Sequence, residues 1–104
     1  MSPDIPQVNQ VTVSGRVFDK VRELATKATA RGDGEAFLAA LREFDRRLRV
    51  YPQFGDPLID LWEPTGQIRL GIVPPLAMRY AVFEERRLVL VVALPVLLPR
   101  QSSK

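Results

Sequence analysis

The chain has 104 residues, 46% of them hydrophobic, and its 15 Lys and Arg residues against 12 Asp and Glu residues give a net charge of +3. This length favours a single domain, 1–104, with a loose arm over 1–10 and a flexible tail over 99–104. The absence of cysteine and histidine excludes disulfides and removes the commonest metal ligands and the commonest general base. The apolar run Leu88–Leu98 is shorter than the ~20 residues of a spanning helix and is interrupted by Pro95. We therefore expect a cytoplasmic protein without membrane segment, signal peptide, metal or cofactor.

The first half of the chain has the pattern of two amphipathic helices. Val11–Val13 is a short β-branched segment, typical of an edge strand. Ser14 can cap a first helix, and after a glycine-rich break Asp33 can cap a second. In each helix the apolar residues recur along one face, formed by Val17, Val21, Leu24 and Ala28 in the first and by Phe37, Leu41, Phe44 and Leu48 in the second. The short connection predicts an antiparallel helical hairpin.

The pattern changes from helical to extended after a proline-rich turn. The second helix is expected to end near Val50, because Pro52 disfavours helical geometry at Tyr51. Four short strands follow, at residues 58–62, 67–73, 76–83 and 88–94. Tight connections favour an antiparallel meander, and the helical hairpin should cover one of its faces. The predicted fold class is therefore a two-layer α+β domain.

The two central strands each carry an arginine at a position that alternation directs away from the helices. The residues predicted to face the helices are Ile68, Leu70 and Ile72 in one strand and Met78, Tyr80 and Val82 in the next. A two-residue hairpin loop at Pro74-Pro75 is disfavoured, because the favoured two-residue turns need φ > 0. A three-residue loop centred on Pro74 would place Arg69 directly opposite Arg79, and like charges so placed cost ~0.2–1 kcal/mol. The pair predicts an anion-binding site, with a simple solvated pair as the alternative.

The last strand places large aliphatic residues on the same face as Arg79. A turn symmetric about Glu85-Arg86 leads to this arrangement, and the residues concerned are Leu88, Leu90, Val92 and Leu94. A sheet face in contact with water rarely carries so many aliphatic side chains. We expect a cover for them, provided by a partner protein, by a second copy of the chain, or by the tail folded back from Pro95.

The second helix also carries a basic stripe. Arg42, Arg46 and Arg49 recur at helical spacing, so they share one side of the helix. They are candidates for binding RNA phosphates, with a strong dependence on salt. The alternative is neutralisation within the helix, where Glu43 can pair with Arg47 and Asp45 with Arg49.

The segment Leu41–Leu61, L-R-E-F-D-R-R-L-R-V-Y-P-Q-F-G-D-P-L-I-D-L, contains a turn of the form P-x-x-G-x-P-L between the helix and the first strand of the meander. In this motif and in the order of its elements over residues 13–96, the chain resembles the RelE/ParE toxins of bacterial toxin–antitoxin pairs. Arg79, in M-R-Y-A-V-F, matches the arginine of the family's G-x-Y-R-x-x-Y strand, with Met78 in place of the preceding tyrosine. Arg69, in Q-I-R-L, and Arg100 fall near the other basic positions of the family.

The resemblance implies a toxin that cleaves messenger RNA on the ribosome, with Arg69, Arg79 and Arg100 as ligands of the phosphate and the transition state. It also implies a cognate antitoxin covering the aliphatic residues of the last strand. The C-terminal segment, however, lacks the tyrosine or histidine that serves proton transfer in cleaving members, a contribution of ~10²–10⁴-fold. The alternative is therefore a non-enzymatic protein, either a ParE-like inhibitor of DNA gyrase or an inactive toxin homologue that acts as a protein-binding module.

Overall fold

The computed structural model describes residues 8–60 and 66–99. It contains the predicted helical hairpin. Helix α1 spans Gly15–Ala30 and helix α2 spans Gly34–Val50. The Ser14 hydroxyl caps α1 by accepting a hydrogen bond from the backbone N–H of Val17 at 3.3 Å. Asp33 stands at the N-cap of α2 but makes no side-chain cap bond there, since its carboxylate pairs with Arg31 at 2.7 Å.

The strands form one mixed sheet. Its members are β1 (Gln10–Thr12), β2 (Asp56–Asp60), β3 (Gly66–Val73), β4 (Leu76–Phe83), β5 (Leu88–Val91) and β6 (Val96–Leu97), with short 3₁₀ turns η1 (Pro52–Phe54) and η2 (Glu84–Arg86). The order across the sheet is β1-β5-β4-β3-β2, and β6 pairs with β4 beyond the end of β5. Strands β2 to β5 form the predicted antiparallel meander, while β1 lies parallel to β5 at the edge.

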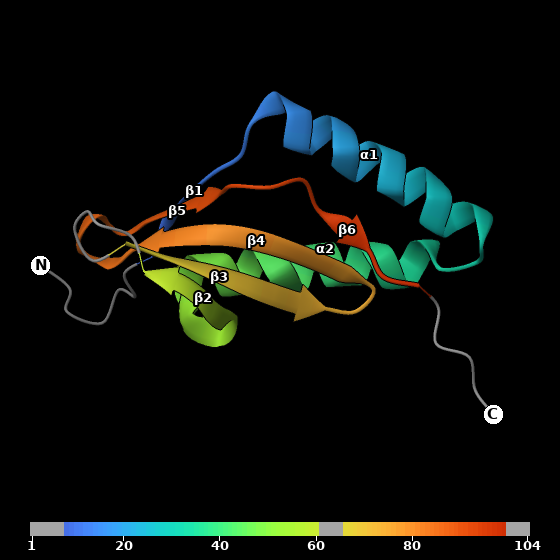
Figure 1. The fold of residues 1–104 in the computed structure, drawn as a ribbon. Helices are drawn as coiled ribbons and strands as arrows, with labels where there is room; N and C mark the ends of the chain where they lie inside the picture. Colours follow the sequence, from blue (N-terminus) through green and yellow to red (C-terminus); the bar gives the residue numbers. More distant parts are fainter. Residues whose placement is uncertain (1–7, 61–65, 100–104) are drawn as a thin grey trace, which may run out of the picture.

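Both helices pack on the same side of this sheet, which confirms the α+β class and the hairpin packing (Figure 1). Helix α2 lies against β3 and β4, and α1 packs on α2 and β6. The core contains the predicted helical faces, and its largest fully buried side chains are Phe37, Phe44, Leu76, Tyr80 and Val89. Among the described residues, no helix is both long and apolar enough to cross a membrane.

The loop between β3 and β4 differs from the prediction and changes which side chains share a face. Val73 pairs with Leu76, so Pro74 and Pro75 form a two-residue turn with a cis peptide bond between them, as in type VI turns. A turn of this type does not need the φ > 0 on which the prediction of a longer loop depended. The register is therefore shifted by one residue, and a shift of one residue moves every side chain of a strand to the opposite face.

The hairpin between β4 and β5 follows the prediction more closely. Phe83 pairs with Leu88 and Tyr80 with Val91, which is the register of a turn symmetric about residues 85 and 86. The strand predicted over 88–94 is shorter in the structure, where β5 ends at Val91, and β6 follows at Val96–Leu97, beyond the predicted end. Residues 9 and 10, predicted to belong to a loose arm, are bonded to the fold, because the backbone N–H of Asn9 donates to Arg49 O at 2.8 Å and that of Gln10 to Arg87 O at 2.8 Å. The predicted turn at 63–66 and the end of the first strand at 61–62 fall largely outside the described residues.

Candidate functional site

The side of the sheet away from the helices, here called the open face, is largely apolar. The pairing of β3 with β4 brings Ile68, Leu70 and Ile72 of β3 to this side, beside Ala81, Arg79 and Ala77 respectively. The prediction that these three β3 residues face the helices is therefore wrong. Along the other edge of β4 and on the same open face, Phe83 and Ala81 pair with Leu88 and Leu90 of β5. No described helix covers this face.

Among the described residues of the two central strands, β3 and β4, Arg79 is the only cation on the open face. It is exposed and lies between Leu70 on β3 and Val92, whose backbone N–H donates to Arg79 O at 3.1 Å. Among the described residues its guanidinium makes no ion pair. Ile72 and Val92 nearby are 45% and 47% exposed, so a charged group stands among water-exposed aliphatic side chains. Such a surface favours a partner that supplies both apolar groups and a negative charge.

Arg69 does not join Arg79, because it pairs with Tyr80 and therefore lies on the helix side. Its guanidinium donates to the carbonyl oxygens of Gln53 at 2.9 Å and Gly55 at 2.5 Å. The predicted juxtaposition of Arg69 and Arg79 is wrong, and with it the predicted anion site between them. In this structure Arg69 holds the turn after α2 against β3. Arg100, the third predicted phosphate ligand, lies outside the described residues.

Tyr80 also binds this turn, which is the P-x-x-G segment singled out in the sequence. Together we call the hydrogen bonds of Arg69 and Tyr80 to this turn the clamp. The fully buried hydroxyl of Tyr80 donates to Pro52 O at 2.6 Å and accepts from the Gly55 N–H at 3.0 Å, and its ring stacks on Phe54 with centroids 5.8 Å apart. Burial raises the pKa of Tyr80 to about 12. Because this hydroxyl already donates and accepts a hydrogen bond inside the core, its role is structural. The prediction that Tyr80 faces the helices is confirmed.

The basic stripe of α2 is largely paired within the helix. Glu43 accepts from both Arg46 and Arg47 at 2.6 Å, and Asp45 pairs with Arg49 at 3.1 Å. Hydrogen bonds from Arg46 and then Arg47 lower the pKa of Glu43 to about 2. The predicted intrahelical pairs are therefore confirmed. Arg42 is exposed, and a role of Arg42, Arg46 and Arg49 in binding RNA stays a prediction.

The aliphatic residues predicted to contact a partner divide into two groups. Leu88, Leu90 and Val92 lie on the open face, as expected from the register of β5. Leu94 does not, because the chain leaves the ladder after Val91 and Leu94 instead lies beside Arg16 and Lys20 of α1. Val96, in β6, takes up the open face again opposite Ala77 and is 54% exposed.

Comparison of the chain with protein-family models, with curated proteins and with solved structures found no match. Within the described residues, no group of acidic side chains is arranged to hold a metal ion. Ile68, Leu70 and Ile72 are members of the open face that the sequence pattern did not indicate. Their alternation was visible, but the face to which it belongs depends on the turn at Pro74-Pro75.

Proposed function

We propose that this protein is a RelE/ParE-like toxin component that acts by binding proteins, and that its open face is the surface on which a cognate antitoxin lies. The observation that carries the proposal is the position of Arg79, an exposed cation among the aliphatic side chains of β3 and β5. The P-x-x-G-x-P-L turn and the element order support the toxin resemblance. The alternative foreseen from the sequence, a non-enzymatic module, becomes the favoured interpretation.

Two described groups whose chemistry could serve RNA cleavage make other contacts in the fold. Arg69 is bound to two backbone carbonyls on the helix side, and the hydroxyl of Tyr80 is buried between Pro52 and Gly55. Cleavage by a 2′-hydroxyl is accelerated by transition-state charge stabilisation and by proton transfer. Of the two residues predicted to provide the first that the structure describes, Arg69 and Arg79, only Arg79 is exposed on the open face.

The charge of Arg79 also favours a different protein over a second copy of this chain. In a two-fold dimer built through the open face, the same patch meets itself, so the Arg79 side chains of both copies would enter one apolar interface. Like charges in such a position cost free energy, whereas an Asp or Glu of another protein would form a desolvated pair with Arg79. An antitoxin segment with a carboxylate between aliphatic side chains has this chemistry.

The experiment is co-expression of the tagged chain with the reading frame next to its gene, followed by affinity purification and titration of the purified partner. Arg79→Glu and Leu90→Glu should each weaken the complex at least tenfold. Arg86→Glu, an exposed substitution in η2, is the matched control and should leave affinity within twofold. Equal binding by Arg79→Glu, Leu90→Glu and the control would refute the open face as the antitoxin surface.

Ribosome-dependent cleavage of messenger RNA remains a second candidate, because Arg79 matches the family's strand arginine and its guanidinium is exposed. Induced expression of the chain in cells, followed by mapping of messenger RNA 5′ ends, separates the two functions. Cuts inside codons that disappear with Arg79→Ala would support cleavage. A DNA-damage response without such cuts would support the gyrase-directed alternative.

A further inference from the structure

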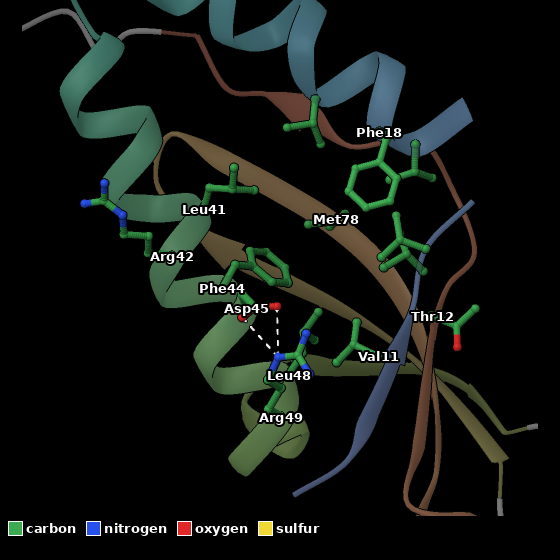
Figure 2. Close-up of a pocket in the computed structure, with 14 residues that line it drawn as sticks. Val11, Thr12, Phe18, Leu41, Arg42, Phe44, Asp45, Leu48, Arg49 and Met78 are labelled. Atoms are coloured by element: carbon green, nitrogen blue, oxygen red, sulfur yellow. Dashed lines mark hydrogen bonds and ion pairs between the residues drawn. The ribbon is translucent and has the colours of Figure 1, made fainter. Parts of the chain in front are cut away.

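A second candidate site lies on the opposite side of the sheet, in a half-open cleft of about 640 Å³ between α1, α2 and β1 (Figure 2). Its walls come from three parts of the chain: Val17 and Val21 of α1, Leu41 and Leu48 of α2, and Val11 of β1, with Met78 of β4 at its floor. Figure 2 shows Phe18, Leu41 and Phe44 directed into the space between the two helices. The volume falls within the roughly 300–1,000 Å³ typical of small-molecule sites.

The interior of the cleft offers no directional polar contact. Its lining is mostly aliphatic, and the described part of the core contains no buried polar or charged residue besides the clamped Tyr80 hydroxyl, which lies at the turn after α2. Such a wall selects an occupant by shape and by apolar contact. A flexible hydrocarbon chain meets both conditions, since it has no polar group that would lose its hydrogen bonds inside.

The polar groups of the cleft stand at its mouth. Asp45 and Arg49 form an ion pair at 3.1 Å there, with 55% and 47% of their side chains exposed. A pair so exposed to water contributes little to stability, so Arg49 can exchange Asp45 for another carboxylate at small cost. Arg42 also belongs to the lining, and its guanidinium is directed outward in Figure 2. Since Arg42 is directed away from the cleft, Arg49 is the cation that an occupant would meet at the mouth.

The mouth also carries an exposed aromatic residue. Phe18 is 57% exposed although it stands on α1 next to the apolar wall. Contact with a bound chain would remove part of this ring from water, which favours binding.

From the apolar interior and the exposed Arg49 guanidinium at the mouth we propose that the cleft binds a single-chain anionic amphiphile of the medium-chain fatty acid class, with its hydrocarbon chain between α1 and α2 and its carboxylate at Arg49. The occupant is a free fatty acid rather than a bilayer lipid. One cleft accommodates one hydrocarbon chain, so the second chain of a diacyl lipid would remain in water. The site is separate from the open face, since Met78 and Val91 in its lining lie on the helix side of the sheet.

The test is titration of the full chain with dodecanoate, below its critical micelle concentration, by calorimetry and by amide NMR. Saturable binding to one site is expected, with shifts at residues that line the cleft, such as Val21 and Leu41, and little change on β3 and on the open face. Dodecanol should bind more weakly, dodecyltrimethylammonium weakest, and anionic phospholipid vesicles should retain no protein.

Two variants connect this binding to the cleft. Phe18→Asp should weaken dodecanoate binding at least tenfold, whereas Leu38→Asp should not; Leu38 is a comparably exposed apolar residue, 47% exposed, on α2 outside the lining. Arg49→Ala should weaken dodecanoate binding about threefold to tenfold and leave dodecanol binding unchanged. Each variant is first checked for a native-like amide spectrum.

Several results would overturn the proposal. These are the absence of saturable binding, equal effects of Phe18→Asp and Leu38→Asp, and NMR shifts confined to the open face. Concentration-dependent shifts of the cleft residues without ligand, together with a dimer in light scattering, would assign the cleft to a second copy of the chain. Protection of these residues only by a protein partner would assign it to that partner.

Discussion

Removal of the Tyr80 hydroxyl tests whether the turn after α2 is held to the sheet by the contacts seen in the structure. In Tyr80→Phe the ring keeps its stacking on Phe54, but the Pro52 carbonyl loses its donor at 2.6 Å and the Gly55 N–H loses its acceptor at 3.0 Å. A buried polar group left without a partner costs about 1–3 kcal/mol. Two such groups give an upper range of about 2–6 kcal/mol.

The expected loss is near the lower end of that range. Arg69 continues to bind the carbonyls of Gln53 and Gly55, so the turn stays near β3, and Gln53 and Phe54 beside it are only partly buried, which lets water approach. We expect Tyr80→Phe to lower the free energy of unfolding by about 2 kcal/mol. With a urea m-value of about 1–2 kcal/mol/M, the unfolding midpoint should fall by about 1–2 M.

The control for this measurement is the other tyrosine of the chain. Tyr51 is 58% exposed, and Tyr51→Phe should change stability by less than about 0.5 kcal/mol. Urea unfolding followed by circular dichroism compares the two variants under identical conditions. If Tyr80→Phe shifted the midpoint no more than Tyr51→Phe does, the clamp would contribute nothing measurable and the argument from unsatisfied partners would be refuted.

Three other predictions follow from the same structure. The pKa of Tyr80 is raised from 10.0 to about 12, so its stabilisation is complete below pH 10 and is lost as the pH rises from 10 through 12. We expect a tyrosinate absorbance step coupled to unfolding in that window and missing in Tyr80→Phe, and a step near pH 10 in the folded chain that disappears in Tyr80→Phe would contradict it. Gly71→Ala should destabilise by about 1–3 kcal/mol in thermal or urea unfolding, because a Cβ there would lie 2.8 Å from the rings of Phe44 and Phe54, whereas Gly15→Ala, with nothing within 4 Å, should be neutral or stabilising; equal effects would show that the packing against Gly71 is loose. Arg69→Met should lower the unfolding midpoint while Arg79→Met leaves it nearly unchanged, and the reverse order would exchange the structural and surface roles assigned to these arginines.

The candidate site could be predicted from the sequence only in part. The positions of Leu88 and Leu90 followed from the symmetric turn at residues 85 and 86, and Arg79 was correctly directed away from the helices. The prediction that Arg69 shares this face depends on a three-residue loop at Pro74, whereas the structure has a two-residue turn at Pro74-Pro75. The actual pairing of Arg69 with Tyr80 turns that arginine from a proposed phosphate ligand into a support of the turn after α2.

Local sequence by itself determined the helices and the two sides of β4. The cap at Ser14, the end of α2 before Pro52 and the alternation around Tyr80 are set by interactions within a few residues, so a pattern of apolar and polar positions is sufficient to predict them. Tertiary structure decided the register of β3, the parallel pairing of β1 with β5 and the cleft between the helices. Each of these depends on how segments distant in the chain meet, and a one-residue change in that meeting reverses which side chains face the core and which face a partner.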